Sequence, residues 1–461
     1  MPPGEEGDFT YNERGQAMKK QQNAGLSHRR GFMAAAATGL AMPVLAPAQE
    51  AQPTESLERG RTRVAGFADA EMDYQLMRQL GAVRYGGASV GECLALAQRI
   101  QNGVPASWVA EFAAAGVRQE QDAAARARRG HVVSARDQYL VASNSYRAAE
   151  YYCGVLDPKH AQLGLKSREC FLAAMHQQGG AFEAFSLPFG ETPLPAYYIR
   201  APQARARRGK TLMIISGYDG TLEETWLAYG RAALERGYHL MLFTGPGQMD
   251  TLRFHPGIAF IPEYERVAKV ALDHVLSRPG TDPRRVALMG ISFGGYFATR
   301  MAAHEPRIRA LIANSPIVDL HAYMASFAGF DPAQMPDAED IRLADVDAIP
   351  PTVIPPQTRE MMRNLMVRLG QESFKRAYQR LHDFRVNDTA LRAIRCPVLG
   401  LTGSGEGAEP LAQAERFHHG VGGPATRHMF TDLEGADGHC QNANLAYSAA
   451  VSMDWLDELF A

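Results

Sequence analysis

The chain has 461 residues, of which 46% are hydrophobic and 21% charged, a composition that excludes disordered, collagen-like and coiled-coil proteins. Its 48 Lys and Arg residues and 50 Asp and Glu residues give a net charge of −2. This balance gives no electrostatic reason to expect nucleic acid or an acidic membrane as a partner. Five scattered cysteines without a CxxC pair argue against a disulfide framework and against a zinc or iron–sulfur site.

Residues 1–48 are predicted to be an export signal. The pair Arg29-Arg30 precedes an Ala-rich, mildly apolar stretch, and this arrangement resembles the twin-arginine signal. The sequence Ala46-Pro47-Ala48 supplies a small-x-small cleavage pattern. The apolar stretch is shorter than the ~20 residues of a membrane-spanning helix, so we expect no stable membrane insertion after signal removal. The mature protein is expected in the periplasm or outside the cell.

An N-terminal helical cap is predicted after the signal. Residues 49–66 are Pro-, Glu- and Arg-rich without an apolar period and are interpreted as a linker. Over residues 67–180 apolar side chains recur at helical spacing, as at Met72 and Leu76. Ser134 is a candidate N-cap for one of the helices.

Residues 181–461 are predicted to form the catalytic domain. Short apolar runs alternate with helical stretches, a pattern typical of an α/β fold with a doubly wound, mostly parallel sheet covered on both faces. Pro-rich and helical material at about residues 320–390 interrupts this rhythm and is interpreted as an insertion that roofs the site. The predicted strands are residues 196–199, 211–215, 238–243, 286–289, 310–313, 397–401 and 427–430.

Ser292 is the predicted nucleophile. It lies in a G-x-S-x-G motif between a buried strand and a helix, and this context makes the motif specific. Gly290 and Gly294 lack the Cβ atoms that would prevent so tight a turn from closing. The turn lifts the hydroxyl to the carboxyl edge of the sheet and to a helix N-terminus, where free N–H groups favour a developing negative charge.

His439 is the predicted base. In sheets of this kind the catalytic residues follow in the order serine, acid, histidine. His439 lies in a loop after the last strand and therefore faces the same sheet edge as the serine. His418 and His419 fall in a predicted helix, and His428 falls in a strand predicted to be buried.

Glu406 is the predicted acid of the triad. It lies three residues past Gly403, which ends a strand, and this is the usual place for the acid. Two alternatives remain for the acid. One is Glu409, and the other is Asp319, which lies at the end of the preceding strand. Asp437 is close in sequence to the histidine and is expected to shape its loop.

The loop after residues 211–215 is predicted to complete the oxyanion hole. Tyr218 would supply one backbone N–H, and Phe293, just past the nucleophile, would supply the other. Asp219 follows directly and is a candidate substrate-binding residue. Glu223 and Glu224 are expected to stabilise a helix N-terminus.

A glycine-rich stretch, Gly245-Pro246-Gly247-Gln248, follows another predicted strand. It lacks the Gly-Lys-Ser/Thr of a phosphate loop and the third glycine of a dinucleotide site. We interpret it as a tight turn.

Several stretches together resemble a family of α/β-hydrolases with an N-terminal helical cap, which includes 2,6-dihydroxypseudooxynicotine hydrolase and fungal hydrolases that shorten polyketide chains. The resemblance is carried by Tyr85–Ala88, Ser134–Arg136, Tyr146–Glu150, Gly217–Glu224, Gly245–Gln248, Gly290–Gly295, Gly435–Cys440 and Asp454–Leu456. It implies the α/β-hydrolase fold, a serine–histidine–acid triad and a homodimer. It also implies cleavage of carbon–carbon bonds next to ketones, as several members perform.

The sequence departs from that family at two positions. The nicotine-pathway enzyme has a further Glu after its oxyanion loop, and its place falls on Asp219, which could polarise or protonate a leaving group. Glu406 stands where the triad acid is more usually Asp. The shorter carboxylate at position 219 argues against the same substrate.

The sequence therefore predicts an exported serine hydrolase acting on a medium-sized, partly apolar carbonyl compound, because a cap encloses a pocket and excludes polymers. Such chemistry requires no metal or organic cofactor. The alternatives are a carboxylesterase or peptidase-like acyl hydrolase, and a non-catalytic binding module on the same fold. Labelling by a fluorophosphonate probe separates the module from the enzymes.

Export is testable by substitution of the arginine pair. If residues 29 and 30 form a twin-arginine signal, the double variant Arg29→Lys, Arg30→Lys should leave the precursor in the cytoplasm. Cell fractionation with an antibody to the mature protein measures this, and unchanged export of the double variant would contradict the predicted localisation.

Overall fold

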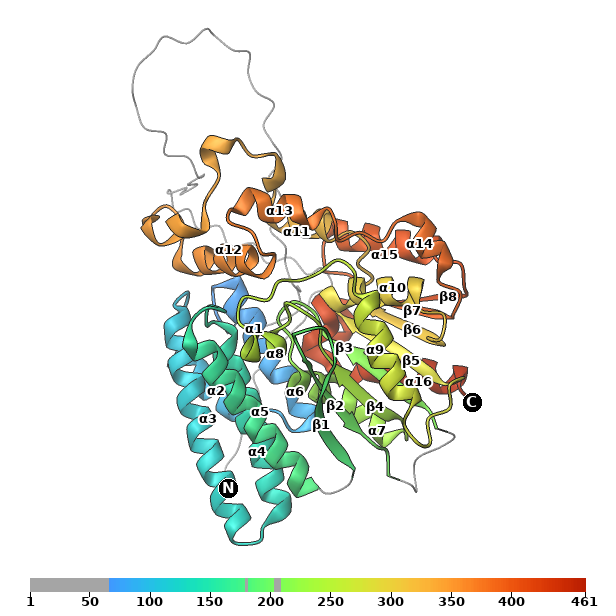
Figure 1. Cartoon of the computed structure of the whole chain (residues 1–461). Helices are drawn as coiled ribbons and strands as arrows, with labels where there is room; N and C mark the ends of the chain where they lie inside the picture. Colours follow the sequence, from blue (N-terminus) through green and yellow to red (C-terminus); the bar gives the residue numbers. More distant parts are fainter. Residues whose placement is uncertain (1–65, 179–180, 203–208) are drawn as a thin grey trace, which may run out of the picture. The chain divides into compact units, whose positions relative to one another are not determined.

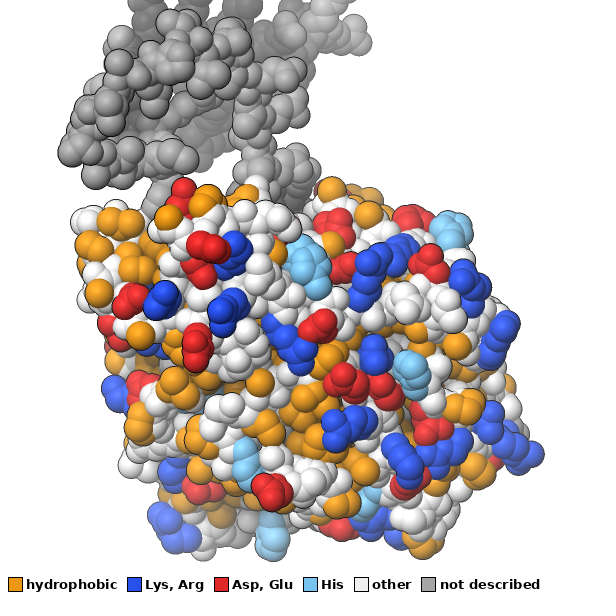
Figure 2. Space-filling view, turned by 45° about the horizontal axis from the view of Figure 1, so that its top comes forward, with side chains coloured by type: hydrophobic (Ala, Val, Ile, Leu, Met, Phe, Trp, Pro, Cys, Tyr) orange, Lys and Arg blue, Asp and Glu red, His pale blue; other side chains and the backbone are white. Residues whose placement is uncertain are grey.

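The computed structural model describes residues 66–178, 181–202 and 209–461. The predicted export signal, residues 1–48, lies outside the described residues, as does nearly all of the predicted linker. Within the described part, none of the helices has both the length and the apolar character needed to cross a bilayer. On the face shown in Figure 2, acidic and basic side chains are interspersed, as the near-equal numbers of the two kinds would give.

Five helices form the N-terminal cap (Figure 1). They are α1 (Ala70–Gly81), α2 (Val90–Ala97), α3 (Pro105–Arg128), α4 (Val132–Tyr151) and α5 (Pro158–Gln178). Their apolar faces meet around Trp108 and Phe112, both 1% exposed. The expectation that Ser134 caps a helix is wrong, because α4 begins at Val132. Gly130, with φ of +77°, reverses the chain after α3, and the N-cap of the next helix is His131, three residues earlier than predicted.

An eight-stranded sheet forms the core of the remaining chain, in the order β1-β2-β4-β3-β5-β6-β7-β8. The pairs β1–β2 and β2–β4 are antiparallel and the others parallel, which confirms the predicted mostly parallel α/β fold. The strands are β1 (Phe182–Leu187), β2 (Leu194–Ile199), β3 (Thr211–Ile215), β4 (His239–Phe243), β5 (Val286–Ile291), β6 (Ala310–Asn314), β7 (Val398–Gly403) and β8 (Ala425–Phe430).

The two edge strands differ from the sequence-based expectation. Strand β1 was not predicted, because most of its side chains are exposed or half-buried and it has no continuous apolar run. Strand β8 is also an edge strand, with its first five residues exposed or half-buried. His428 is therefore half-buried at the sheet edge rather than in a buried strand.

Helices cover both faces of the sheet because successive strand residues point to opposite faces. In β3, Met213 and Ile215 join the apolar cluster that contains α9 (Glu265–Leu276) and α10 (Phe293–His304). Leu212 and Ile214 join the cluster on the other face. That cluster contains α6 (Leu222–Thr225), a π-helical turn (Trp226–Gly230), α7 (Arg231–Glu235) and α16 (Leu445–Leu459).

The segment between β6 and β7 is the predicted insertion. Its helices are α11 (Leu320–Ala328), α12 (Pro356–Arg368), α13 (Phe374–Leu381) and α14 (Asp388–Ala393), with short 3₁₀ turns at Pro332–Gln334, Asp337–Glu339 and Leu343–Ala348. After β7 the chain forms α15 (Ala408–Gly420), and β8 is followed by 3₁₀ turns at Asp432–Glu434 and His439–Asn444. Tyr323 on α11 and Arg368 on α12 reach the edge of the sheet that carries Ser292.

A fully buried ionic cluster joins the cap to the core. Arg253, on α8 (Met249–Phe254), pairs with Glu150 of α4 at 2.6 Å and with Glu223 of α6 at 3.1 Å. None of these three side chains is more than 1% exposed. The expected helix-capping role of Glu223 is therefore incomplete, because Thr221 caps α6 and Glu223 binds an arginine. Removing one partner of such a buried pair leaves the other charge uncompensated and costs about 3–5 kcal/mol, so these residues of the cap and the core depend on one another.

Candidate active site

Ser292 occupies a sharp turn between β5 and α10. Its φ of +59° and ψ of −126° lie in a strained region for a residue with a side chain. The turn closes because Gly290 lacks a Cβ atom, which would lie 2.6 Å from the Cβ of Ala298 and collide with the carbonyl group of Gly294. The hydroxyl therefore projects at the carboxyl edge of the sheet, beside the first turn of α10.

The structure brings Ser292, His439 and Glu406 together. Nε2 of His439 lies 2.9 Å from Oγ of Ser292, and Nδ1 lies 2.7 Å from Oε2 of Glu406. The Glu406 carboxylate is 1% exposed and accepts hydrogen bonds from the Gly403 N–H at 2.8 Å and from the Ser315 hydroxyl at 2.6 Å. These two donors fix the carboxylate that contacts the imidazole. The contribution of Ser315 was not predicted, since it lies 91 positions from its partner.

The alternative acids have other partners. Glu409 accepts a hydrogen bond from the Gln413 amide at 2.8 Å. Asp319 caps α11 and lies 3.5 Å from Arg385. The Asp437 carbonyl accepts the N–H of Gly405 at 2.9 Å, which supports the loop as expected. Of the acids considered, Glu406 is the one at hydrogen-bond distance from His439.

The surroundings of His439 favour its charged form. Burial alone would lower its pKa, but the neighbouring Cys440 and Glu406 outweigh burial and raise the pKa of His439 to about 10. Sγ of Cys440 lies 3.4 Å from Nε2, and the Tyr323 hydroxyl lies 3.5 Å from Nδ1. The Tyr74 hydroxyl, from α1 of the cap, donates to the His439 carbonyl at 3.2 Å. The imidazole is therefore held from several sides.

The predicted oxyanion residues lie on two loops that touch. A Cβ atom added to Gly217 would lie 2.7 Å from both the Phe293 nitrogen and the Ser292 Cβ. The rings of Tyr218 and Phe293 are 5.3 Å apart in an edge arrangement. Within the described residues, neither the Tyr218 N–H nor the Phe293 N–H donates a hydrogen bond. The loops next to Ser292 therefore carry two backbone N–H groups that are unpaired among the described residues.

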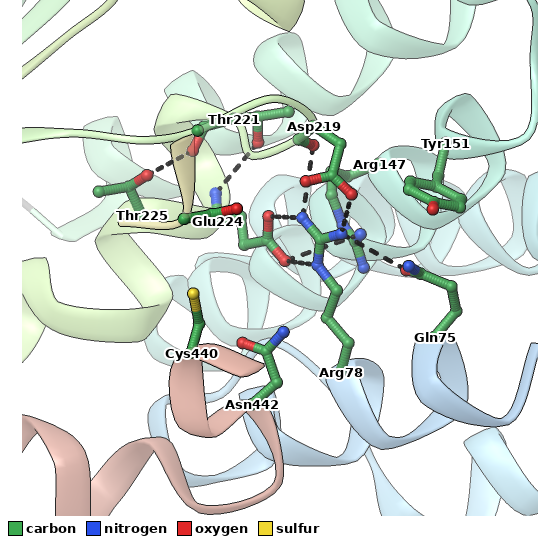
Figure 3. Close-up of polar contacts among 12 residues, drawn as sticks. Gln75, Arg78, Arg147, Tyr151, Asp219, Thr221, Glu224, Thr225, Cys440 and Asn442 are labelled. Atoms are coloured by element: carbon green, nitrogen blue, oxygen red, sulfur yellow. Dashed lines mark hydrogen bonds and ion pairs between the residues drawn. The ribbon is translucent and has the colours of Figure 1, made fainter. Parts of the chain in front are cut away.

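Asp219 takes part in an ion-pair network with the cap (Figure 3). Arg78 of α1 lies between Asp219, at 2.8 Å, and Glu224, at 2.5 Å, and Arg147 of α4 lies 3.6 Å from Glu224. Burial opposes ionisation of Glu224, but Arg147 and Arg78 lower its pKa. Glu224 thus pairs with arginines and is more than a helix-terminal charge. No sequence signal indicated Arg78, which is 141 positions from Asp219.

A pocket lies between these charged groups and the serine. Its walls include Ser292, His439, Cys440 and Asp219 from the core, and Tyr74 and Arg78 from the cap. The cap therefore lines the pocket, as expected. Among the described residues, no group of three or more His, Cys, Asp or Glu side chains is arranged to hold a metal ion.

Known proteins show where this chain belongs. Residues 267–348, which include Ser292, match the prolyl oligopeptidase family. The chain is 30% identical over 367 residues to the α/β hydrolase xenA of Xenoacremonium sinensis, covering 74% of this chain and 84% of the relative. It is 28% identical over 437 residues to the hydrolase LUC6 of a Fusarium species, covering 86% and 97%.

A solved structure shares the fold. The crystal structure of 2,6-dihydroxy-pseudo-oxynicotine hydrolase superimposes with a TM-score of 0.64 at 19% identity, covering 82% of this chain and 94% of the other. This chain has an N-terminal helical cap and a mostly parallel sheet. Together with the sequence relatives, these observations show that the chain is a hydrolase of the α/β-hydrolase family, with an N-terminal helical cap.

Proposed function

We propose that this protein is an exported serine hydrolase that acts on a medium-sized, uncharged carbonyl compound. The observation that carries the proposal is the continuous contact from Ser292 through His439 to Glu406, at 2.9 Å and 2.7 Å. A nucleophile, a base and an orienting acid at these distances are the requirement for nucleophilic catalysis by serine. The export part of the proposal rests on residues 1–48 alone.

The reaction proceeds in two halves. Oγ of Ser292 attacks the substrate carbonyl while His439 takes its proton, and the N–H groups of Tyr218 and Phe293 stabilise the oxyanion. When the tetrahedral intermediate collapses, His439 returns the proton to the leaving group. Water, activated by the same imidazole, then releases the acyl group and regenerates the serine. Glu406 holds the imidazole and stabilises its charge.

Cleavage of a carbon–carbon bond next to a ketone is the finer part of the proposal. The leaving group is then an enolate or phenol-stabilised carbanion, which takes its proton from His439. Support comes from the pocket, where Arg78 and Asp219 provide a cation and a carboxylate near Ser292. Because Asp219 is paired with Arg78, we infer that it accepts a hydrogen bond from the substrate rather than protonating the leaving group. The similar solved structure is named for hydrolysis of 2,6-dihydroxy-pseudo-oxynicotine.

The proposal is tested by active-site labelling. A fluorophosphonate probe should label the mature protein, and Ser292→Ala should abolish the label, because the probe needs an activated serine. Ser292→Ala and His439→Ala should each lower kcat by at least ~10³-fold, since the triad acts as a unit. Ser404→Ala, at an exposed serine near Glu406, is the control and should keep both label and activity. Absence of labelling in the wild type would favour a binding module.

The pH dependence of kcat/KM tests Glu406. A base must be neutral, so activity should rise with pH as His439 loses its proton, with the ascending limb above the ordinary value of 6.5. Removing the negative charge in Glu406→Gln should move that limb to lower pH and lower the plateau. Profiles measured from about pH 5 to about pH 11 on an ester substrate report both effects. An unchanged profile would assign the acid to Glu409 or Asp319.

The substrate class is tested at Asp219. In Asp219→Asn, kcat/KM should fall for β-diketones or acyl-phenols and change little for small activated esters, because a substrate hydroxyl or enol loses its anionic acceptor. Asp273→Asn, at a surface ion pair with Arg307, is the control. Equal losses on both substrate types, or no diketone cleavage by the wild type, would make a plain carboxylesterase the better interpretation.

A further inference from the structure

The loop from Ser216 to Asp219 is held by a buried amide. The side chain of Gln248 is inaccessible to solvent, and its Nε2 donates to the Ser216 carbonyl at 2.8 Å and to the Gly217 carbonyl at 3.2 Å. Its Oε1 accepts the N–H of Gly245 at 2.6 Å. Because the acceptor oxygen must face that N–H, the amide has one orientation, with its donor toward the loop.

A buried guanidinium holds the next peptide of the same loop. Arg368, at the end of α12, is 1% exposed and donates to the carbonyls of Tyr218 and Gly247, the latter at 2.7 Å. Its guanidinium carbon lies 3.6 Å from the centre of the Tyr218 ring and 4.8 Å from that of Phe260. Its guanidinium donates to the backbone carbonyls of Gly247 and Tyr218 and, within the described part of the chain, forms no ion pair with a carboxylate. The buried guanidinium of Arg368 thus holds the backbone at Tyr218 and Gly247.

Peptide geometry converts these contacts into an orientation of donors. In a trans peptide the C=O and the following N–H point in opposite directions. Gln248 binds the Gly217 carbonyl, so the Tyr218 N–H points away from Gln248. The Gly217 backbone packs against Ser292 and Phe293, and the Tyr218 N–H is unpaired among the described residues. The plane that carries the predicted oxyanion donor is therefore set by a side chain on another element.

We propose that Gln248 and Arg368 are positioning residues for the oxyanion hole. Gln248 fixes the peptide plane of the Tyr218 N–H, and Arg368 stops that plane from rotating by holding the carbonyl on the other side of Tyr218. The inference rests on the proposed function. It gives a role to the Gly245–Gln248 turn, whose sequence suggested only a tight bend, and to the insertion, which supplies Arg368.

Gln248→Glu is the decisive variant. Glutamate has the same length and can still accept the Gly245 N–H, but it replaces the amide donor with an oxygen that does not donate to the Ser216 and Gly217 carbonyls when ionised. We expect kcat on an ester to fall by about 10–100-fold, somewhat less than for the loss of an oxyanion donor itself, with KM nearly unchanged. A trifluoromethyl ketone, which forms a tetrahedral adduct with the serine, should lose affinity by the same factor. Substrate affinity measured in the Ser292→Ala background should not change on adding Gln248→Glu.

Thr251→Val is the matched control. Thr251, on α8, is equally buried and donates to the carbonyl of Gly245 in that turn at 2.9 Å, and none of its hydrogen bonds among the described residues goes to the Ser216–Asp219 loop. Its loss should lower Tm while leaving kcat and adduct affinity near wild type. Arg368→Lys keeps the charge but can donate to fewer carbonyls. It should lower kcat and adduct affinity as Gln248→Glu does, but by a smaller factor. If Gln248→Glu shows no cooperative unfolding transition and is therefore not folded, the same measurements are made on Gln248→Met and Arg368→Lys.

Three results would overturn the inference. The first is a kcat equal to that of the wild type in the folded Gln248 variants. The second is a decrease in substrate affinity with no decrease in kcat. The third is a decrease of kcat in Thr251→Val as large as that in Gln248→Glu. A wild-type protein that neither hydrolyses esters nor reacts with the fluorophosphonate would instead overturn the proposed function, so the two failures are distinguishable.

Discussion

The strained backbone of Ser292 is the constraint on which the arrangement of the site depends. A positive φ at a residue with a side chain persists only where its surroundings hold it. Here the neighbouring parallel strands do so: β3 places Ile215 beside Gly290, β6 places Asn314 beside Ile291, and the Ser292 N–H donates to the Asn314 carbonyl at 2.5 Å. Because these strands all end at one edge, the loops that follow β3, β5, β7 and β8 converge there. The parallel order of the strands therefore brings the residues of the site together, because each of them lies at or just after the end of a strand.

The cap turns this open edge into a pocket, and buried ion pairs hold it in place. Arg78 reaches from α1 to Asp219 and Glu224, while Arg253 reaches from α8 to Glu150 on α4. Each buried charge meets an opposite one from the other part of the chain. Removing one partner by substitution would leave the other charge buried without compensation, which is costly. The contacts of Arg78 with Asp219 and Glu224 therefore join the cap to the core and also form a polar wall of the pocket.

Local signals explain which features could be predicted. The buried strands and the turn at Ser292 were evident because apolar runs and a G-x-S-x-G motif are written in consecutive residues, and strand order then indicated His439 and Glu406 as partners. Edge strand β1 was missed because it has no apolar run. The partners of Asp219 and Glu224, and the role of Gln248, depend on contacts across tens to more than a hundred positions. A single sequence contains no signal for such pairs, so Arg78 and Arg368 emerged only from the fold.

The charges around the pocket also bear on what can occupy it. Arg78 and Arg147 of the cap face Asp219 and Glu224 of the core, so two cations balance two carboxylates. An ionic substrate would have to displace one of these pairs, whereas an uncharged compound with carbonyl and hydroxyl groups can bind to them without breaking any. Next to Ser292, the Glu406 carboxylate accepts hydrogen bonds from Gly403 and Ser315, and its charge favours the protonated form of His439. Opposite charges thus already face one another in the site, and the charge that the proposed reaction adds is the oxyanion formed on the carbonyl of a neutral substrate.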